Sequence, residues 1–489
     1  IRMLVFLLFL LPFVSSLDIL MYVNVAGKSH LQFAEKLIEL LNENGHTVDA
    51  VFGMLNSYVH LKGTYGTRSL AAVHFPGESP WGQVAQHIIH PFEKSSELSR
   101  LIPEPNKFLE TSAQLCDLLL DSSEVAQLLS LNRYDLAMIT GYDLCPFALA
   151  YVHKISPAVS FVPTPAYMTQ YYQAGLPELP LYENIVFDAR YAPKSSFIRR
   201  VFESLRTARE RYAHHQASIH ITEKFRARFG DDFPDAREIM RNVSLDFTNS
   251  HPLLEEPKPI SFRLRYIGGI ALPRPNPLDQ KLKEMLDLAP KGNVIFSFGT
   301  QVGHEKISEE LKRVFIRTFQ RFPEYNFLWK FDGVTDFNAS NIFNLDWLPQ
   351  TDLLYDSRVV TFISHMGLNS FTEASFAGVP VVAIPLFADQ VHNALRALAL
   401  GTGKIVRKTE ITEENLTRAL SAILFDERYL NRAKELASMI SAYPDSPQRT
   451  FLEGIEVAAK MKNLSSHFRL AGANHHYLVQ IGWDVASFL

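Results

Sequence analysis

Residues 17–52 read LDILMYVNVAGKSHLQFAEKLIELLNENGHTVDAVF, and this stretch decides the fold class. Residues 17–25 and 46–52 are mostly apolar runs of strand length. Between them, apolar residues recur at the spacing of one helix face, namely Leu31, Ala34, Leu37, Ile38 and Leu41. Gly45 then ends the helix. A strand–helix–strand order predicts parallel strands joined by a right-handed crossover, and hence an α/β domain.

A second α/β half is predicted after a proline-rich stretch. Prolines crowd together between roughly 251 and 290, which we interpret as an interdomain linker. The strands predicted beyond it are 293–298, 326–331, 359–364 and 379–384, and one more strand is predicted at 134–139 in the first half. A chain of 489 residues exceeds what one core usually organises. Two such halves predict a ligand cleft between the carboxyl ends of two sheets.

Composition excludes some functional classes. The chain is 47% hydrophobic and 20% charged, with a formal net charge of -4 and no block of like charges. Nucleic-acid binding normally needs a concentrated basic surface, so we expect no nucleic-acid partner. The cysteines, Cys116 and Cys145, are too few for a disulfide scaffold and form no C-x-x-C metal pair.

The first residues have the layout of a secretory signal peptide. Arg2 precedes an apolar run over 4–11, and small residues follow at 14–16. A buried first strand fits less well, because the predicted strand at 17–25 follows directly. N-glycosylation triplets agree with a chain in the secretory lumen and stand at Asn242, Asn338, Asn415 and Asn463.

Polar residues follow two predicted strands of the first half. His30 opens the helix after the first strand, with Ser29 as the expected cap and Gln32 completing a capping box. An imidazole there can take a proton from a hydroxyl group at neutral pH. Asp143 follows the strand at 134–139 and can orient such a base. The plain alternatives are a surface histidine for His30 and a helix cap for Asp143.

The segment 347–390 carries a dense set of polar groups at strand ends. The candidate residues are Trp347, Gln350, His365, Gly367, Asn369, Ser370, Glu373, Asp389 and Gln390. An indole can stack on a planar base. Small and polar residues at a helix start suit a diphosphate, which helix amides and the helix dipole stabilise. Glu373 can accept ribose hydroxyls or close a capping box with Ser370.

This pattern resembles the signature of the UDP-glycosyltransferases, in particular the animal UDP-glucuronosyltransferases. The segments that carry the resemblance are Ser29-His30, Gly45-His46, IGG at 267–269, FSFGT at 296–300, WLPQ at 347–350, FISHMGLNSFTE at 362–373, GVP at 378–380 and DQVHN at 389–393. Together they span essentially the whole chain, and their ordered spacing is more specific than any single short motif.

The resemblance implies a GT-B fold, with two Rossmann-like α/β domains facing a central cleft. After the signal peptide at 1–16, it implies an acceptor-binding domain at 17–270 and a UDP-sugar-binding domain at 271–460. It also implies inversion by one direct displacement without a required metal, and the chain has no D-x-D triplet. His30 would be the general base and Asp143 its partner.

The same resemblance assigns the donor-binding roles. Trp347 and Gln350 would hold the uracil. His365, Gly367, Asn369 and Ser370 would meet the diphosphate, with help from Thr300. Glu373 would bind the ribose, and Asp389 with Gln390 the sugar.

The chain departs from the family pattern at three places. Many family members carry the partner aspartate at the position of Thr140, so Asp143 is displaced by about one helical turn. Met366 replaces a glycine of the usual H-G-G and can crowd the phosphate site. Family members continue into a membrane-spanning helix, to which 461–489 would lead. The resemblance therefore predicts an anchor outside this chain, and an endoplasmic reticulum location.

We therefore expect transfer of glucuronic acid or glucose from a UDP-sugar to a hydroxyl of a small apolar acceptor. Residues 161–172 are predicted to form part of one acceptor wall. The alternatives are a UDP-glucosyltransferase dedicated to sterols or lipids and a nucleotide-sugar-binding pseudoenzyme. The resemblance is also compatible with homo-oligomers and implies no cofactor beyond the UDP-sugar.

Overall fold

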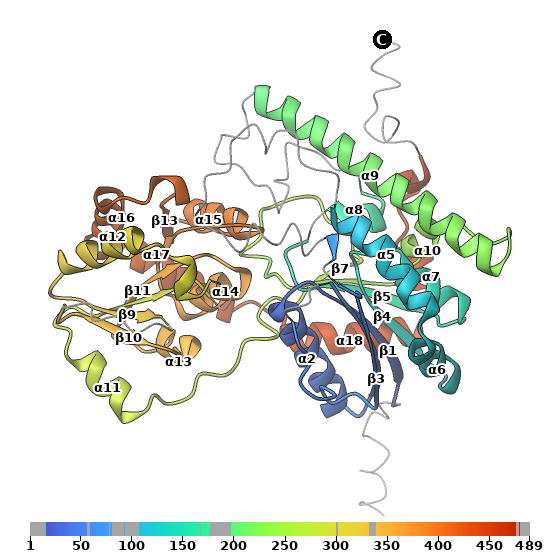
Figure 1. Ribbon diagram of the computed structural model, residues 1–489, viewed down its shortest axis with the longest axis horizontal. Coiled ribbons are helices and arrows are strands. Elements are labelled where there is room, and N and C mark those ends of the chain that lie inside the picture. Colours follow the sequence, from blue (N-terminus) through green and yellow to red (C-terminus); the bar gives the residue numbers. More distant parts are fainter. Residues whose placement is uncertain are drawn as a thin grey trace, which may run out of the picture.

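The structure is a computed structural model with two lobes side by side, each built around one parallel sheet (Figure 1). It describes residues 16–55, 59–77, 79–80, 92, 107–166, 168–176, 197–299, 302–331, 339–475 and 479. Nearly all of the predicted signal peptide, the donor residue Thr300 and the glycosylation triplet at Asn338 lie outside the described residues.

The first domain holds a seven-stranded parallel sheet within the described part, in the order β3-β2-β1-β4-β5-β6-β7. Its strands are β1 (Asp18–Val25), β2 (Thr47–Met54), β3 (Ser69–His74), β4 (Leu136–Thr140), β5 (Ala158–Val162), β6 (Asp246–Thr248) and β7 (Leu264–Tyr266). The predicted parallel pairing of the first two strands is confirmed, with Asp18 opposite Thr47 and Val25 opposite Met54.

Helices cover both faces of this sheet. They are α2 (Lys28–Glu43), α5 (Lys107–Asp121), α6 (Ser123–Leu131), α7 (Cys145–Val152), α8 (Met168–Ala174), α9 (Phe197–Phe229) and α10 (Ala236–Arg241). Alternate residues of β1 point to opposite faces. Ile19 and Met21 pack with α2, whereas Leu20 and Tyr22 pack with α5, α6 and α7. None of the helices that the structure describes combines the length and apolar character needed to cross a bilayer.

Helix α2 begins earlier than the sequence predicted. Its cap is Gly27, in extended conformation, and the cap makes no side-chain hydrogen bond. The prediction that Ser29 caps the helix is wrong, because the Gly27 carbonyl already accepts from the backbone N–H of His30 at 3.1 Å. His30 nevertheless lies in the first turn, as expected. Gly45 follows the helix with φ +82°, a conformation that favours glycine.

The second domain holds a six-stranded parallel sheet within the described part, in the order β10-β9-β8-β11-β12-β13. Its strands are β8 (Asn293–Ser297), β9 (Asn326–Lys330), β10 (Ile342–Leu345), β11 (Val359–Ser364), β12 (Val381–Ala383) and β13 (Gly403–Ile405). The four strands predicted in this half are confirmed as β8, β9, β11 and β12, while β10 and β13 complete the edges. Two Rossmann-like sheets make the α/β GT-B fold that was expected.

The remaining helices cover the second sheet or follow it. They are α11 (Gln280–Asp287), α12 (Glu309–Gln320), α13 (Gln350–Leu354), α14 (Leu368–Ala377), α15 (Gln390–Ala399), α16 (Glu413–Phe425), α17 (Glu427–Ser441), α18 (Pro447–Lys460) and α19 (Leu464–His467), with 3₁₀ turns η2 (His304–Lys306), η3 (Lys408–Glu410) and η4 (Ala471–Asn474). α12 and α16 pack on one face, and α11, α13, α14, α15 and α17 pack on the other.

The proline-rich stretch is only partly a linker. Within 251–290, β7 adds an edge strand to the first sheet, and α11 packs its apolar face into the second domain. The apolar residues Leu282 and Leu286 of α11 are buried there. A composition rich in proline marked the change of domain but did not reveal these two elements.

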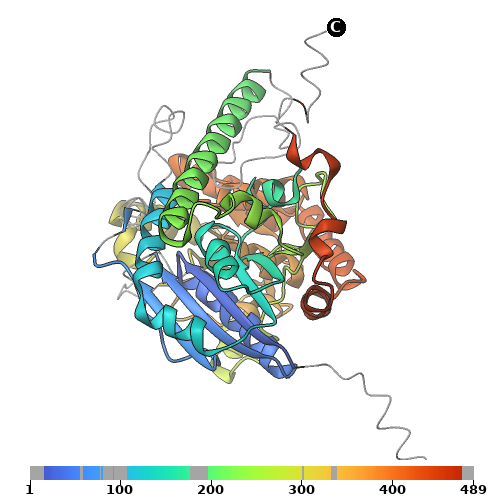
Figure 2. The ribbon, with the colours of Figure 1, turned by 90° about the vertical axis from the view of Figure 1, so that its right-hand side faces the viewer.

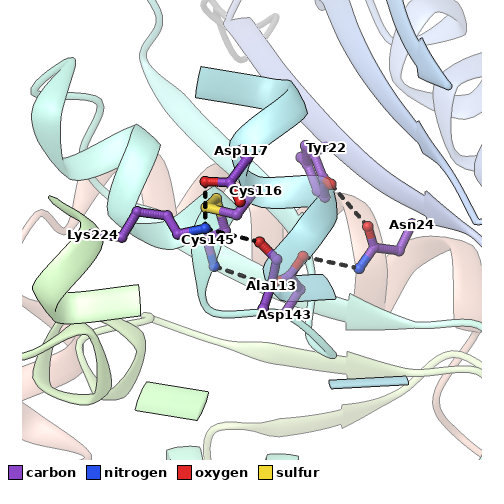
Figure 3. Close-up of a disulfide and its surroundings, with 8 residues drawn as sticks. All are labelled: Tyr22, Asn24, Ala113, Cys116, Asp117, Asp143, Cys145 and Lys224. Carbon is purple, nitrogen blue, oxygen red and sulfur yellow. Dashed lines mark hydrogen bonds and ion pairs between the residues drawn. A yellow bond between two sulfur atoms is a disulfide. The ribbon is translucent and has the colours of Figure 1, made fainter. Parts of the chain in front are cut away.

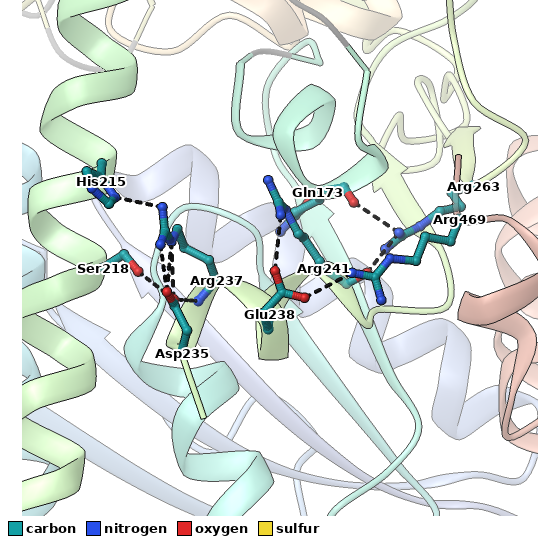
Figure 4. A network of polar contacts seen from close by, with 9 residues as sticks. All are labelled: Gln173, His215, Ser218, Asp235, Arg237, Glu238, Arg241, Arg263 and Arg469. Atoms are coloured by element: carbon teal, nitrogen blue, oxygen red, sulfur yellow. Dashed lines mark hydrogen bonds and ion pairs between the residues drawn. The ribbon is translucent and has the colours of Figure 1, made fainter. Parts of the chain in front are cut away.

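The last helices that the structure describes return to the first domain. α18 packs against the first domain, although 271–460 was expected to belong to the second domain (Figures 1 and 2). The physical reason is that Phe451 and Ile455 bury their side chains in the first core, with Phe451 5.3 Å from Phe247 between ring centroids. Farther along, Arg469 pairs with Glu238 of α10 at 2.9 Å (Figure 4).

Candidate active site

His30 lies at the carboxyl edge of the first sheet, in the first turn of α2. Its Nδ1 is 3.3 Å from the backbone carbonyl oxygen of Asn24 in β1. A carbonyl can only accept, so Nδ1 carries the ring proton and Nε2 keeps a free lone pair. Burial lowers the pKa of His30 to about 4. The imidazole is therefore neutral at pH 7 and able to accept a proton.

Asp143 is buried, and its hydrogen bonds go to groups other than this histidine. Its Oδ1 accepts from the backbone N–H of Cys145 at 3.0 Å, and its Oδ2 accepts from Asn24 Nδ2 at 3.4 Å. Burial raises the pKa of Asp143 to about 6. Among the described residues, no hydrogen bond joins His30 to Asp143. In this part of the chain, Asp143 thus bonds to the first turn of α7 and to Asn24, and not directly to the predicted base.

The two cysteines form a disulfide, which the sequence did not predict. Cys116 of α5 is bonded to Cys145 at the start of α7, next to Asp143 (Figure 3). The residues are 29 apart in sequence, with no motif that marks them as a pair. The bond ties the loop that carries Asp143 to a helix on the same face of the sheet.

Three predicted donor-binding residues come together in the second domain. Gln350 Nε2 donates to Ser370 Oγ at 3.1 Å and also to the Glu373 carboxylate. Glu373 Oε1 accepts from Thr351 Oγ1 at 3.1 Å. Glu373 thus bonds to α13 rather than closing a capping box at its own helix. Burial raises the pKa of the Glu373 carboxyl.

Trp347 precedes this cluster and exposes its indole. Its side chain is 67% exposed, unusually high for so large an apolar group. The Lys330 ammonium lies over the ring at 5.3 Å from its centroid and donates to the Gly299 carbonyl at 2.8 Å. An exposed aromatic face beside Gln350 suits the stacking role predicted for it.

His365 precedes α14 in the sequence, at the start of the predicted diphosphate site. A Cβ atom on Gly299 would come within 2.7 Å of the His365 ring, and so would a Cβ on Gly367. Both glycines therefore make room for the imidazole. Burial first, and then the charge of Lys330, lowers the pKa of His365 to about 4. Gly367 caps α14, and Asn369 is exposed in its first turn.

Met366 does not crowd this site. Its backbone has φ +65°, in the left-handed region where a glycine is usual, and its side chain is fully buried in the core of the second domain. The loop is held by two hydrogen bonds, because Met366 N donates to Ser364 Oγ and its carbonyl accepts from Asn393 Nδ2, both at 3.0 Å. Its burial in the core places the side chain away from the predicted phosphate site.

We predict that Met366→Gly lowers stability and leaves nucleotide binding unchanged. Removing a buried side chain of this size costs about 2–5 kcal/mol, whereas relief of the left-handed backbone returns about 1–2 kcal/mol. The free energy of unfolding should fall by about 1–3 kcal/mol, measured by denaturant unfolding. UDP affinity should stay within twofold by calorimetry, and a larger loss would place the side chain at the phosphate site.

Asp389 and Gln390 stand before and at the start of α15. Asp389 Oδ2 accepts from Asn393 Nδ2 at 2.8 Å, and burial raises the pKa of Asp389 to about 6. Gln390 Oε1 accepts from the backbone N–H groups of Leu386 and Phe387. The Gln390 side-chain oxygen therefore holds the loop before α15. The predicted hydrogen bond to the sugar would have to come from its amide nitrogen.

Tyr142 lies beside His30 and was not predicted from the sequence. Its ring centroid is 6.0 Å from that of His30, and its hydroxyl is 3.1 Å from Thr164 Oγ1. Burial raises the pKa of Tyr142, and the charge of Asp389 raises it further. Asp389 of the second domain therefore lies within electrostatic reach of the residue beside His30.

The structure gives no support for the predicted acceptor wall at the end residues that it describes. Phe161 faces the core of the first domain, 6.4 Å from Phe33 between ring centroids, and so does not line a pocket. Tyr171 is buried beneath the Lys258 ammonium, and the side chain of Tyr172 lies outside the described residues.

The first domain carries a neutral histidine at the ends of its parallel strands, and the second carries the exposed indole of Trp347 and the first turn of α14. These features are those expected of a GT-B glycosyltransferase. The family described as UDP-glucoronosyl and UDP-glucosyl transferase matches residues 21–489, and the chain belongs to it. It is therefore an enzyme of the class that transfers sugars from UDP-sugars.

Known relatives agree with this assignment. The chain is similar to UDP-glucosyltransferase 2 of Dactylopius coccus, with 26% identity over 96% of this chain and 89% of the relative. It is likewise similar to a putative UDP-glucuronosyltransferase of Caenorhabditis elegans, with 26% identity over 94% and 89%. A UDP-glucosyltransferase from Polygonum tinctorium has the same fold, with TM-score 0.58 and 16% identity over 92% of this chain and 100% of that one.

Proposed function

We propose that the enzyme transfers a hexosyl group, glucose or glucuronic acid, from UDP to a hydroxyl of a small apolar acceptor with inversion. The observation that carries the proposal is His30, neutral and with Nε2 free, at the carboxyl edge of the first sheet. The cluster of predicted donor residues Gln350, Ser370 and Glu373 in the second domain supports it. Curated relatives named as glucosyl- and glucuronosyltransferases support both donor sugars.

The proposed step is a single displacement. The acceptor oxygen forms a bond to the anomeric carbon while the bond from that carbon to the UDP oxygen breaks and its electron pair leaves with UDP. His30 Nε2 takes the hydroxyl proton. The charge that develops on the diphosphate meets the amide groups at the start of α14. The residues that bind the donor are those predicted above, and the step requires no metal.

A donor panel tests this function. Purified enzyme is incubated with UDP-glucose, UDP-glucuronic acid or UDP-galactose and small phenols, with and without EDTA. We expect transfer from one of the first two donors, unaffected by EDTA, and a β-linked product from the α-linked donor by NMR. An α-linked product would refute inversion. Preference for sterol or lipid acceptors would favour the dedicated glucosyltransferase, and UDP-sugar binding without turnover would favour the pseudoenzyme.

We also propose that the enzyme works in the lumen of the endoplasmic reticulum, anchored by a membrane helix outside this chain. The disulfide between Cys116 and Cys145 supports an oxidising compartment. Asn242 and Asn463 are exposed, as glycan acceptors must be. Asn415 instead uses its amide to donate to the Glu410 carbonyl at 2.9 Å.

We predict that Asn242 and Asn463 carry glycans in a eukaryotic cell and that Asn415 carries fewer, because its amide nitrogen is already engaged. Endoglycosidase digestion followed by mass spectrometry of the peptides measures each occupancy. The single variants Asn242→Gln and Asn463→Gln should each remove one mobility step on a gel. An unglycosylated chain that keeps its first residues would contradict the lumenal location.

A further inference from the structure

Asn24 is a buried asparagine in the mostly apolar strand β1. It lies near the end of β1, is fully buried, and neighbours Val23 and Val25 in the sequence. A buried amide is costly unless its polar atoms are hydrogen-bonded. Its Oδ1 accepts from the Tyr22 hydroxyl at 2.9 Å and its Nδ2 donates to Asp143 Oδ2 at 3.4 Å, so both ends of the amide are engaged (Figure 3).

The backbone of Asn24 is held equally firmly. Its N–H donates to Thr140 Oγ1 at 3.0 Å, and the Thr140 hydroxyl donates to the Tyr22 carbonyl at 2.9 Å. Thr140 therefore joins β4 to the end of β1 through its side chain. The remaining polar atom, the Asn24 carbonyl oxygen, faces His30 Nδ1 at 3.3 Å.

The groups packed around Asn24 hold its hydrogen-bond partners in place. A Cβ atom on Gly53 of β2 would lie 2.6 Å from the Tyr22 hydroxyl and 3.1 Å from Asn24 Oδ1, so this glycine leaves room for the hydrogen bond between them. On the other side, the disulfide of Cys145 holds the loop of Asp143, whose Oδ1 accepts from the Cys145 N–H. Burial and then the charge of Asp143 raise the pKa of Tyr22, which stays protonated as a donor.

We propose that Asn24 is a positioning residue for His30, through which Asp143 acts indirectly. Asp143 and Tyr22 fix the Asn24 amide, and this fixes the strand end whose carbonyl accepts the Nδ1 proton of His30. The imidazole is thereby kept in the tautomer with Nε2 free, which a general base needs. The inference rests on the proposed role of His30 as that base.

The test measures the tautomer of His30 apart from catalysis. Protein labelled with ¹⁵N-histidine is examined by long-range ¹H–¹⁵N NMR, with His30→Gln assigning the signal. Wild type should show a protonated Nδ1. Asn24→Leu, which keeps the branched shape of the side chain but removes both polar atoms of the amide, should shift the population toward the other tautomer. Its kcat should fall about ten- to a hundredfold, by analogy with residues that orient catalytic ligands, while UDP affinity stays unchanged.

Two further variants separate positioning from stability. Asn341 is also a buried asparagine, bonded to backbone carbonyls in the second domain, so Asn341→Leu should destabilise the fold without changing the His30 tautomer. Asp143→Asn alone should lower kcat. In the Asn24→Leu background it should lower kcat no further, because both substitutions break the same chain of contacts.

The results of these experiments test the role of Asn24 and the proposed function separately. An unchanged tautomer and kcat in Asn24→Leu would overturn the inference, as would fully additive effects of the two variants. A tautomer that depends on Asn24 in a protein without transferase activity would support the inference while refuting the proposed function. Sugar transfer by an enzyme whose His30 tautomer does not change in Asn24→Leu would support the proposed function and overturn the inference.

Discussion

Replacing His30 by alanine should lower turnover by about 10²–10⁴, the usual worth of a positioned proton acceptor. The imidazole is neutral at pH 7 because burial lowers its pKa to about 4, so the wild-type base is ready before the acceptor binds. UDP binding should be unchanged, since the predicted donor residues lie in the second domain. Steady-state kinetics with the preferred donor, and calorimetry with UDP, measure the two effects.

The matched control for His30 is His251, a buried histidine elsewhere in the chain. His251 contacts Phe376 and Tyr443 edge-on, and burial lowers its pKa to about 4 as well. His251→Ala should lower the free energy of unfolding, whereas His30→Ala should lower kcat and leave the free energy of unfolding nearly unchanged. If His30→Ala retains wild-type turnover, a different group removes the proton. A parallel fall in UDP affinity would instead show that the substitution disturbs the fold.

The elements that carry the site could be predicted because they follow local patterns. The helix of His30 and the strand before His365 are periodic or apolar segments, and polar residues at their ends stand out against them. The role of Asn24 could not be predicted, because its partner Asp143 is 119 residues away. The only local signal was an amide inside an apolar strand, which indicates a buried polar contact without naming it.

Contacts between distant segments account for the other differences. α18 packs against the first domain because Phe451 and Ile455 bury their side chains in the same core as β1. No local sequence pattern indicates that they join this core rather than that of the second domain, which precedes them in the sequence. The left-handed backbone at Met366 was not predicted either, because a methionine there gives no sign that the loop still follows a path favoured by glycine.

Replacing Trp347 or Glu373 should weaken UDP binding itself. Loss of stacking on the uracil in Trp347→Ala should cost about 1–3 kcal/mol, by analogy with other aromatic–base contacts, whereas Trp347→Phe should keep most of the affinity. The control is Phe425→Ala, which removes another exposed aromatic of the same domain that packs near Phe322. Calorimetric titration with UDP measures all three, and equal affinity for UDP in Trp347→Ala and wild type would exclude stacking.

For Glu373 the competing explanation is structural, because the carboxylate also accepts from Gln350 and Thr351. The 2′-deoxy analogue of UDP separates the two. If Glu373 binds the ribose hydroxyls, wild type should bind the analogue less tightly than UDP, and Glu373→Ala should bind both equally weakly. If Glu373 only holds α13 against α14, the variant should lose affinity for both nucleotides and still prefer UDP. The preference between two nucleotides therefore reports the contact to the ribose, whereas the absolute affinity also reports the integrity of the cluster that supports it.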